Sequence, residues 1–258
     1  MTEPASPSAP PAPPLSRWKA AGIHLFLSAA IGGALIAVML LVWYPWPLFE
    51  VAGGSGLIMI LLGVDVVLGP LITLVVFRAG KKGLKYDLLF IATVQLAALA
   101  YGVHAVFAVR PAYIVFTVDR FELVAAIDLD PNDLAQVSDP AFKRAPFWGP
   151  DYVAASMPAD AAGRQKILES GLAGKDLNLF PQHYVPFERL AADALRRSRP
   201  ASILVQRDPA AMKGYLASAG RTPESLRFLP LRARVGDAAV LLDATSGMPV
   251  KILQVDPW

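Results

Sequence analysis

The residue best placed for unusual chemistry is Asp65, the only ionisable residue in an apolar run over residues 56–77. A carboxylate at the centre of a bilayer costs roughly 2.5–3.5 kcal/mol on insertion scales, so Asp65 should face protein or water rather than lipid. Gly69 and Pro70 follow one helical turn later. Glycine lets a second backbone approach closely, and proline leaves the carbonyl of Val66 without its helical donor. The run therefore predicts a contact surface inside a membrane.

Three interpretations of Asp65 are open. With a helix rise of about 1.5 Å per residue, Asp65 and Tyr101 each lie roughly 12–14 Å from the outer boundary of the bilayer, so the two could form a structural hydrogen bond. Asp65 could instead contact the transmembrane helix of a partner. A proton or ion path is the third interpretation, although a transporter normally has more spans and more intramembrane charges.

The polar segments contain three further candidates for chemistry, each of them incomplete. His183 could act as a general base, but no Gly-x-Ser-x-Gly elbow or other nucleophile motif accompanies it. Asp128, Asp130 and Asp133 loosely resemble a calcium loop that lacks its glycine and its closing glutamate. The glycines and lysines of residues 80–83 lack P-loop spacing, and the chain has no cysteine for a disulfide or thiolate site. The sequence predicts no enzyme, no cofactor and no metal site.

The composition indicates how these residues are positioned. The chain has 258 residues, of which 55% are hydrophobic and only 17% charged, which predicts several membrane spans. A transmembrane domain is expected over residues 17–110, with spans at about 20–42, 56–77 and 88–109. The third span contains Tyr101 but no formal charge. Residues 1–16 carry six prolines and are expected to form a disordered tail.

Basic residues fix the expected orientation in the bilayer. They precede the first span and follow the second, and they are Arg17, Lys19, Arg78, Lys81, Lys82 and Lys85. By the positive-inside rule, the tail and the loop lie in the cytoplasm, where these cations meet anionic inner-membrane lipids. Three crossings then place residues 111–258 in the periplasm of a bacterium. The net charge of +3 is small and scattered, so nothing supports nucleic-acid binding.

The mixture of elements in residues 111–258 predicts an α+β domain. Strands are expected over 112–118 and 121–127, which form a hairpin, and over 152–156, 203–206, 227–234, 238–243 and 249–255. Helices are expected over 159–172, 186–197 and 209–219, with Gly220 ending the last of them.

Several of these segments together resemble a known family. They are Val64-Asp65-Val-Val-Leu-Gly69-Pro70-Leu-Ile-Thr-Leu-Val-Val-Phe77 with Gly80-Lys-Lys-Gly-Leu-Lys85-Tyr-Asp87, Val42-Trp43-Tyr44-Pro45, Gln95 to Gly102, Arg110 to Phe121, Leu229-Pro230-Leu231-Arg232-Ala233 and Pro257-Trp258. The chain from about Arg17 onward resembles the type IV pilin accessory proteins of the TfpX/TfpZ type. The resemblance implies an inner-membrane protein that assists pilin stability, pilus assembly or pilus dynamics and is not a pilus subunit.

The resemblance also suggests a partner and a mechanism. The major type IV pilin is the expected partner, and the pilus assembly machinery is a further candidate. Unassembled pilin would wait in the membrane as one helix with a buried glutamate near a free N-terminal amine. Asp65, Gly69 and Pro70, with Tyr101 at the depth of Asp65, would hold that helix like a chaperone while the periplasmic domain recognises the pilin head. Two rival functions stay open: a periplasmic pilin-modifying enzyme and a membrane-anchored envelope sensor.

Overall fold

A computed structural model describes residues 16–258, so the predicted Pro-rich tail lies outside the described residues except for Ser16. The described chain divides into two compact units. The helical unit comprises residues 16–34 and Met59–Gly102, and the sheet unit comprises Leu35–Ile58 and Val103–Trp258.

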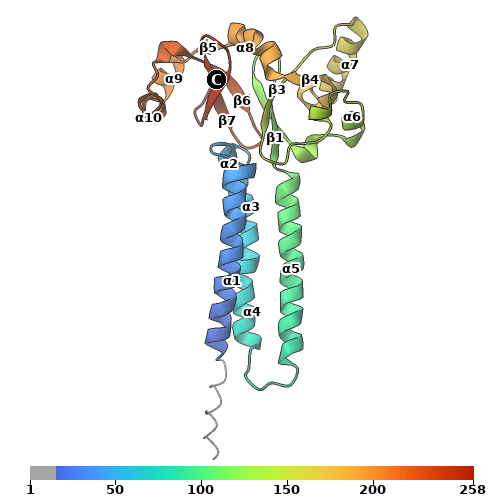
Figure 1. Ribbon diagram of the computed structural model, residues 1–258, viewed down its shortest axis with the longest axis vertical. Coiled ribbons are helices and arrows are strands. Elements are labelled where there is room, and N and C mark those ends of the chain that lie inside the picture. Colours follow the sequence, from blue (N-terminus) through green and yellow to red (C-terminus); the bar gives the residue numbers. More distant parts are fainter. Residues whose placement is uncertain (1–15) are drawn as a thin grey trace, which may run out of the picture. The chain divides into compact units, whose positions relative to one another are not determined.

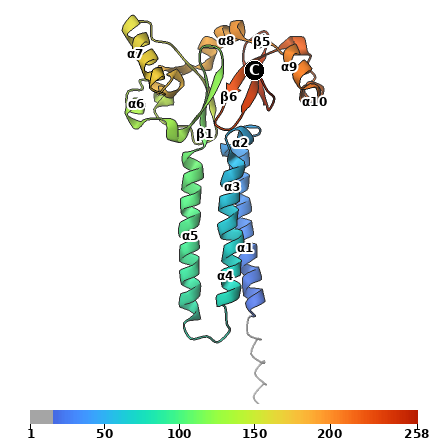
Figure 2. The ribbon, with the colours of Figure 1, turned by 180° about the vertical axis from the view of Figure 1, so that it is seen from behind.

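The helical unit is built from long apolar helices, α1 (Arg17–Val38) and α5 (Leu84–Ala108), with α4 (Gly69–Val76) between them in the chain (Figures 1 and 2). Within residues 16–258, two helices are long and apolar enough to cross a membrane, and they are Arg17–Trp43 and Leu84–Ala108. The first of these includes a π-helical end, η1 (Met39–Trp43). Outward-facing apolar side chains such as Phe26 and Phe90 are more than 70% exposed, which suits a lipid environment better than water.

The predicted second span falls on a composite helix. Here α3 (Gly54–Leu62), the π-helix η2 (Gly63–Leu68) and α4 follow one another without a gap. Pro70 occupies the first turn of α4, where its missing N–H interrupts the regular hydrogen-bond ladder, and the π-turn immediately precedes it. The helix Asp65–Val76 is shorter than a full span when it is counted alone, so a third membrane crossing stays a prediction.

The sheet unit is an α/β domain with one mixed sheet, in which β1 pairs in parallel with β3 and β2 pairs in parallel with β6. The strand order is β4-β3-β1-β2-β6-β7-β8, and β5 adds to β6. The strands are β1 (Pro111–Phe116), β2 (Phe121–Ala125), β3 (Asp151–Ala155), β4 (Tyr184–Pro186), β5 (Arg199–Pro200), β6 (Leu226–Arg232), β7 (Asp237–Asp243) and β8 (Pro249–Leu253). Its helices are α2 (Leu48–Val51), α6 (Pro131–Ala135), α7 (Ala161–Leu172), α8 (Ala191–Arg197), α9 (Ser202–Arg207) and α10 (Pro209–Ala219).

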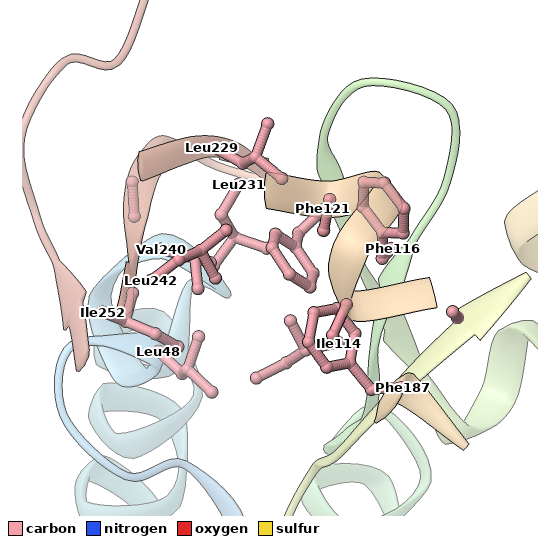
Figure 3. Packing of buried hydrophobic residues seen from close by; sticks show 14 of the residues in the cluster. Leu48, Ile114, Phe116, Phe121, Phe187, Leu229, Leu231, Val240, Leu242 and Ile252 are labelled. Carbon is pink, nitrogen blue, oxygen red and sulfur yellow. The ribbon is translucent and has the colours of Figure 1, made fainter. Parts of the chain in front are cut away.

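Both faces of this sheet are buried, because alternate residues of its strands enter different cores. In β7, Val240 and Leu242 join one core, whereas Ala239 and Leu241 join another on the opposite face. The first core, drawn in Figure 3, contains Phe116 and Phe121 from the first hairpin and Phe187 from the turn before α8. It also receives Leu48 from α2, so the connection between the first two apolar helices forms part of the sheet unit's core.

Most predicted elements are confirmed, including the β1–β2 hairpin, β3, α7, α10 with its left-handed Gly220 cap, and the antiparallel β6–β7–β8 ending. The strand predicted over residues 203–206 is wrong, because this segment lies in helix α9. Its apolar run is short enough to suit either structure. Burial of Ala201 and Leu204, three residues apart, against the same core favours the helix. Strands β4 and β5 were not expected, since both are too short to show a pattern.

Candidate functional site

A cavity of about 250 Å³ lies between helices of the helical unit. We call it the inter-helix cavity. Its walls are mainly apolar, with Leu27 and Ile31 from α1 and Leu99 from α5. Four polar side chains line it as well, and they are His24, Ser28, Asp65 and Gln95. A cavity with this lining inside apolar helices offers hydrogen-bonding groups in surroundings that are otherwise hydrocarbon.

His24 of α1 forms a hydrogen bond with Thr73 of α4 beside this cavity. Its Nδ1 lies 2.6 Å from Oγ1 of Thr73, and the direction of the hydrogen bond depends on the imidazole tautomer. Thr73 is only 3% exposed. Asp65, Gly69 and Thr73 recur every four residues, so these positions lie along one side of the η2–α4 helix.

Gly69 brings α4 and α5 together at the same level. A Cβ atom placed on Gly69 would lie 1.9 Å from Nε2 of Gln95 and 3.1 Å from Nε2 of His24. Only a residue without a side chain leaves room for the Gln95 amide at this position. Gly69 therefore permits a close contact within the chain itself, next to the cavity that Gln95 lines.

Pro70 and the π-turn shape the wall beside Asp65. Asp65 and Val66 both belong to η2 and both line the cavity. The carbonyl of Val66 is the group that would accept a hydrogen bond from residue 70 in a regular helix, and proline has no N–H to donate. π-turns inside helices are frequent at functional sites because they change which side chains face a common point.

The structure places the predicted partner-binding residues unequally. Asp65 is half-buried in the cavity, and Gly69 and Pro70 are buried beside it. Tyr101 is 75% exposed and does not line the cavity. Among the hydrogen bonds of the described residues there is none between Asp65 and Tyr101, so the structural pair suggested by depth alone is not formed.

The six predicted topology residues are all exposed. Arg17 and Lys19 begin α1, and Arg78, Lys81, Lys82 and Lys85 lie in or next to the loop between α4 and α5. Lys81 forms an ion pair with Asp87, and the Lys85 ammonium lies 5.0 Å from the centre of the Tyr86 ring. Exposed cations at the end of apolar helices are suited to contact with anionic lipid headgroups.

The sequence did not predict that His24, Thr73 or Gln95 belongs to this site. One signal could have found them. All three are polar side chains within apolar runs, and polar groups in such runs turn toward one another rather than toward lipid. Pairing them needed the relative rotation of three helices, which periodicity along one helix does not supply.

Asp130 and Asp133, two of the candidates in the sheet unit, form structural contacts. The Asp130 carboxylate caps α6 by accepting from Asn132 N, and buried Asp133 pairs with Lys175. Across residues 16–258 no group of three or more His, Cys, Asp or Glu side chains is arranged to hold a metal ion. Burial, and then the Lys166 ammonium, lower the pKa of His183, which leaves its imidazole uncharged at neutral pH.

Comparisons with known proteins identify the family. Residues 15–53 match the family model "Fimbrial assembly protein FimB". The chain is 28% identical over 219 residues to the fimbrial assembly protein of serogroup I from Dichelobacter nodosus, covering 83% of this chain and 85% of that protein. It is 29% identical over the same shares of both chains to the serogroup E1 protein. It is 32% identical over 120 residues to the protein of serogroups C1 and C2, covering 46% of this chain and 92% of that relative.

No solved structure matches the chain. The relatives agree with the resemblance to type IV pilus accessory proteins that the residues around Asp65 indicate. The chain therefore belongs to the fimbrial assembly protein family, a family of type IV pilus accessory proteins.

Proposed function

We propose that this protein assists type IV pilus assembly by holding the transmembrane helix of unassembled pilin at the inter-helix cavity. The observation that carries the proposal is the cavity itself, where Asp65, His24 and Gln95 meet inside apolar helices. The names of the fimbrial assembly relatives support the pilus as the process involved. In this proposal the protein is a pilin-specific chaperone of the inner membrane and not an enzyme.

The chemistry of the cavity suits a pilin helix with a free amine and a buried glutamate. Asp65 supplies a carboxylate that can accept from the amine, and charged partners attract strongly where water is scarce. The side-chain amide of Gln95 supplies a donor for the pilin carboxylate. Apolar side chains around these groups, such as Leu99, would contact the rest of the pilin helix.

The proposed orientation follows from the exposed cations at one end of the helices. Arg17, Lys19 and the basic residues between α4 and α5 favour the cytoplasmic side of the membrane. With three crossings, the sheet unit is periplasmic and can contact the pilin head, and the remaining assembly machinery can reach the same complex.

The test compares total pilin, by immunoblot, with surface pili in cells that lack the gene and in cells that carry variants. Asp65→Asn keeps the size of the side chain but removes its charge. Asp87→Asn is the matched control because, within residues 16–258, Asp87 forms an ion pair only with exposed Lys81. We expect the deletion and Asp65→Asn to lower total and surface pilin together, and Asp87→Asn to leave both unchanged. Equal pilin levels and piliation in these three strains and in the unaltered strain would overturn the proposal.

A further inference from the structure

The sheet unit presents exposed aromatic side chains in the loop of residues 146–150, which we call the aromatic loop. The loop precedes β3 and has the sequence Pro-Phe-Trp-Gly-Pro. Trp148 is 79% exposed and Phe147 is 49% exposed. Burying large aromatic side chains is favourable, and these two are left exposed. The loop is therefore a candidate contact surface.

The backbone of this loop lies against the outer end of the first apolar helix. A Cβ atom on Gly149 would lie 2.7 Å from the carbonyl oxygen of Val42, and Gly149 has a φ of +105°. Glycine therefore meets two needs here, since it adopts the left-handed backbone region and leaves space for the helix end. The aromatic loop is held at the level where the apolar helix Arg17–Trp43 finishes.

Trp148 forms a continuous apolar surface with that helix end. It lines a hollow of about 330 Å³ together with Leu41 and Trp46. Leu41 is 80% exposed and Trp46 is 63% exposed. The exposed Lys251 lines the same hollow and places a cation beside the two indole rings. The apolar helix end suits the acyl chains of a bilayer, the indole rings suit its interface, and the Lys251 cation suits its headgroups.

Arg110 holds the aromatic loop in place through hydrogen bonds. Its guanidinium donates to the Pro146 carbonyl at 2.9 and 3.3 Å and to the Phe107 carbonyl at 2.7 Å. It also lies 3.7 Å from the centre of the Phe107 ring and is only 5% exposed. The Phe147 ring packs 5.4 Å from Phe107 and 6.4 Å from Trp43, centre to centre. The aromatic side chains are thus presented by a loop with a defined conformation.

We propose that the aromatic loop inserts Trp148, together with Trp46, into the interfacial region of the lipid bilayer. The partner of this surface is lipid, because the surface continues an apolar helix end whose own side chains are exposed. The loop would give the sheet unit an attachment to the membrane besides its chain connections. This inference does not depend on the pilin-binding proposal.

The test uses the full chain in lipid nanodiscs and Trp148 as a fluorescent reporter. The other four tryptophans, at positions 18, 43, 46 and 258, are replaced by phenylalanine. Trp43→Phe loses no hydrogen bond within the described chain, since the buried Nε1 of Trp43 has no partner there. The control carries Trp148→Phe as well and a Leu172→Trp reporter on α7. Leu172 is 85% exposed, and its helix α7 lies apart from α2 in both views (Figures 1 and 2).

Lipids brominated near the top of their acyl chains quench only tryptophans at that depth. We expect strong quenching of Trp148 and no quenching of the Leu172→Trp reporter, with aqueous iodide giving the reverse order. Trp148 quenched by iodide and untouched by the brominated lipids would overturn the inference. So would protection from both quenchers that appears only when a second protein is present. Matching thermal transitions of both reporters and the unaltered chain establish that each variant is folded.

Discussion

Gly69→Ala should weaken pilin binding at the inter-helix cavity while changing the stability of the helical unit little. The new Cβ atom would lie 1.9 Å from Nε2 and 2.9 Å from Cδ of Gln95, so the Gln95 amide must move. Moving a side chain off its preferred rotamer costs about 0.5–1.5 kcal/mol. Alanine in place of glycine inside a helix returns about 1 kcal/mol. The two effects nearly cancel, and we expect the free energy of unfolding to change by less than about 1 kcal/mol.

The matched control is Gly33→Ala, which changes the same residue type on α1. A Cβ atom on Gly33 meets nothing within 4 Å, so the full helix-propensity gain of about 1 kcal/mol should appear. A double variant, Gly69→Ala with Gln95→Ala, removes the atoms that clash and should recover the gain that Gly69→Ala loses. Its coupling free energy should be about 0.5–1.5 kcal/mol and favourable.

Equilibrium unfolding in mixed detergent micelles measures these free energies, and crosslinking to pilin measures use of the cavity. We expect Gly69→Ala to weaken the pilin crosslink because the displaced Gln95 amide enters the space that the pilin helix would occupy. Gly33→Ala should leave the crosslink intact. If Gly69→Ala stabilised the protein as much as Gly33→Ala does, the packing of Gln95 over Gly69 would be refuted. An unchanged crosslink in a folded Gly69→Ala variant would refute the cavity as the pilin site.

Three further predictions concern the sheet unit. Phe121→Ala should lower the free energy of unfolding by about 3–5 kcal/mol, because Phe121 is fully buried, whereas Leu172→Ala on the exposed side of α7 should change it little; thermal unfolding of both variants checks this. Arg110→Ala should lower the free energy of unfolding by about 2 kcal/mol, because it leaves two carbonyls without their charged donor. Arg110→Lys should restore only part of that loss, because lysine cannot reproduce the guanidinium fork. Equal stability of both variants and the unaltered protein would contradict these hydrogen bonds. Burial raises the pKa of Tyr44 and of Tyr113 to about 12, so both phenols keep their protons when folded and lose them near pH 10 when unfolded. The contribution of the two buried phenols to the free energy of unfolding is fully present below pH 10 and is lost as the pH rises toward 12. Tyr44→Phe should therefore make the pH dependence of the melting temperature shallower in that range.

Local patterns in the sequence were sufficient for most elements. Runs of β-branched and aromatic residues after Arg110 predicted the first hairpin, and Gly220 marked the end of α10 as it does in the structure. Residues 203–206 were misassigned because a short apolar run fits a strand or a helix equally well. The parallel pairing of β1 with β3 and of β2 with β6 joins segments far apart in the chain. No local pattern specifies which of two buried strands lies beside a third.

The candidate site was predictable only in part. Asp65 was predictable because a lone carboxylate in an apolar run is costly. Gly69 and Pro70 were predictable because glycine permits close helix contact and proline lacks a backbone donor. The structure adds that Gly69 is covered by Gln95 of the same chain and that His24 bonds to Thr73. Those contacts depend on how three helices are rotated against one another. Helical depth gave Tyr101 the same level as Asp65, but depth does not determine on which side of α5 a residue lies.

Site-specific photocrosslinking in piliated cells tests the central claim most directly. A photoreactive amino acid is placed at Leu99, which lines the inter-helix cavity, and separately at Phe90, which is 71% exposed on the same helix and lies outside the cavity lining. We predict a pilin adduct from position 99 that is lost with Asp65→Asn, and none from position 90. Pilin adducts of equal yield from both positions, or from neither, would contradict the account.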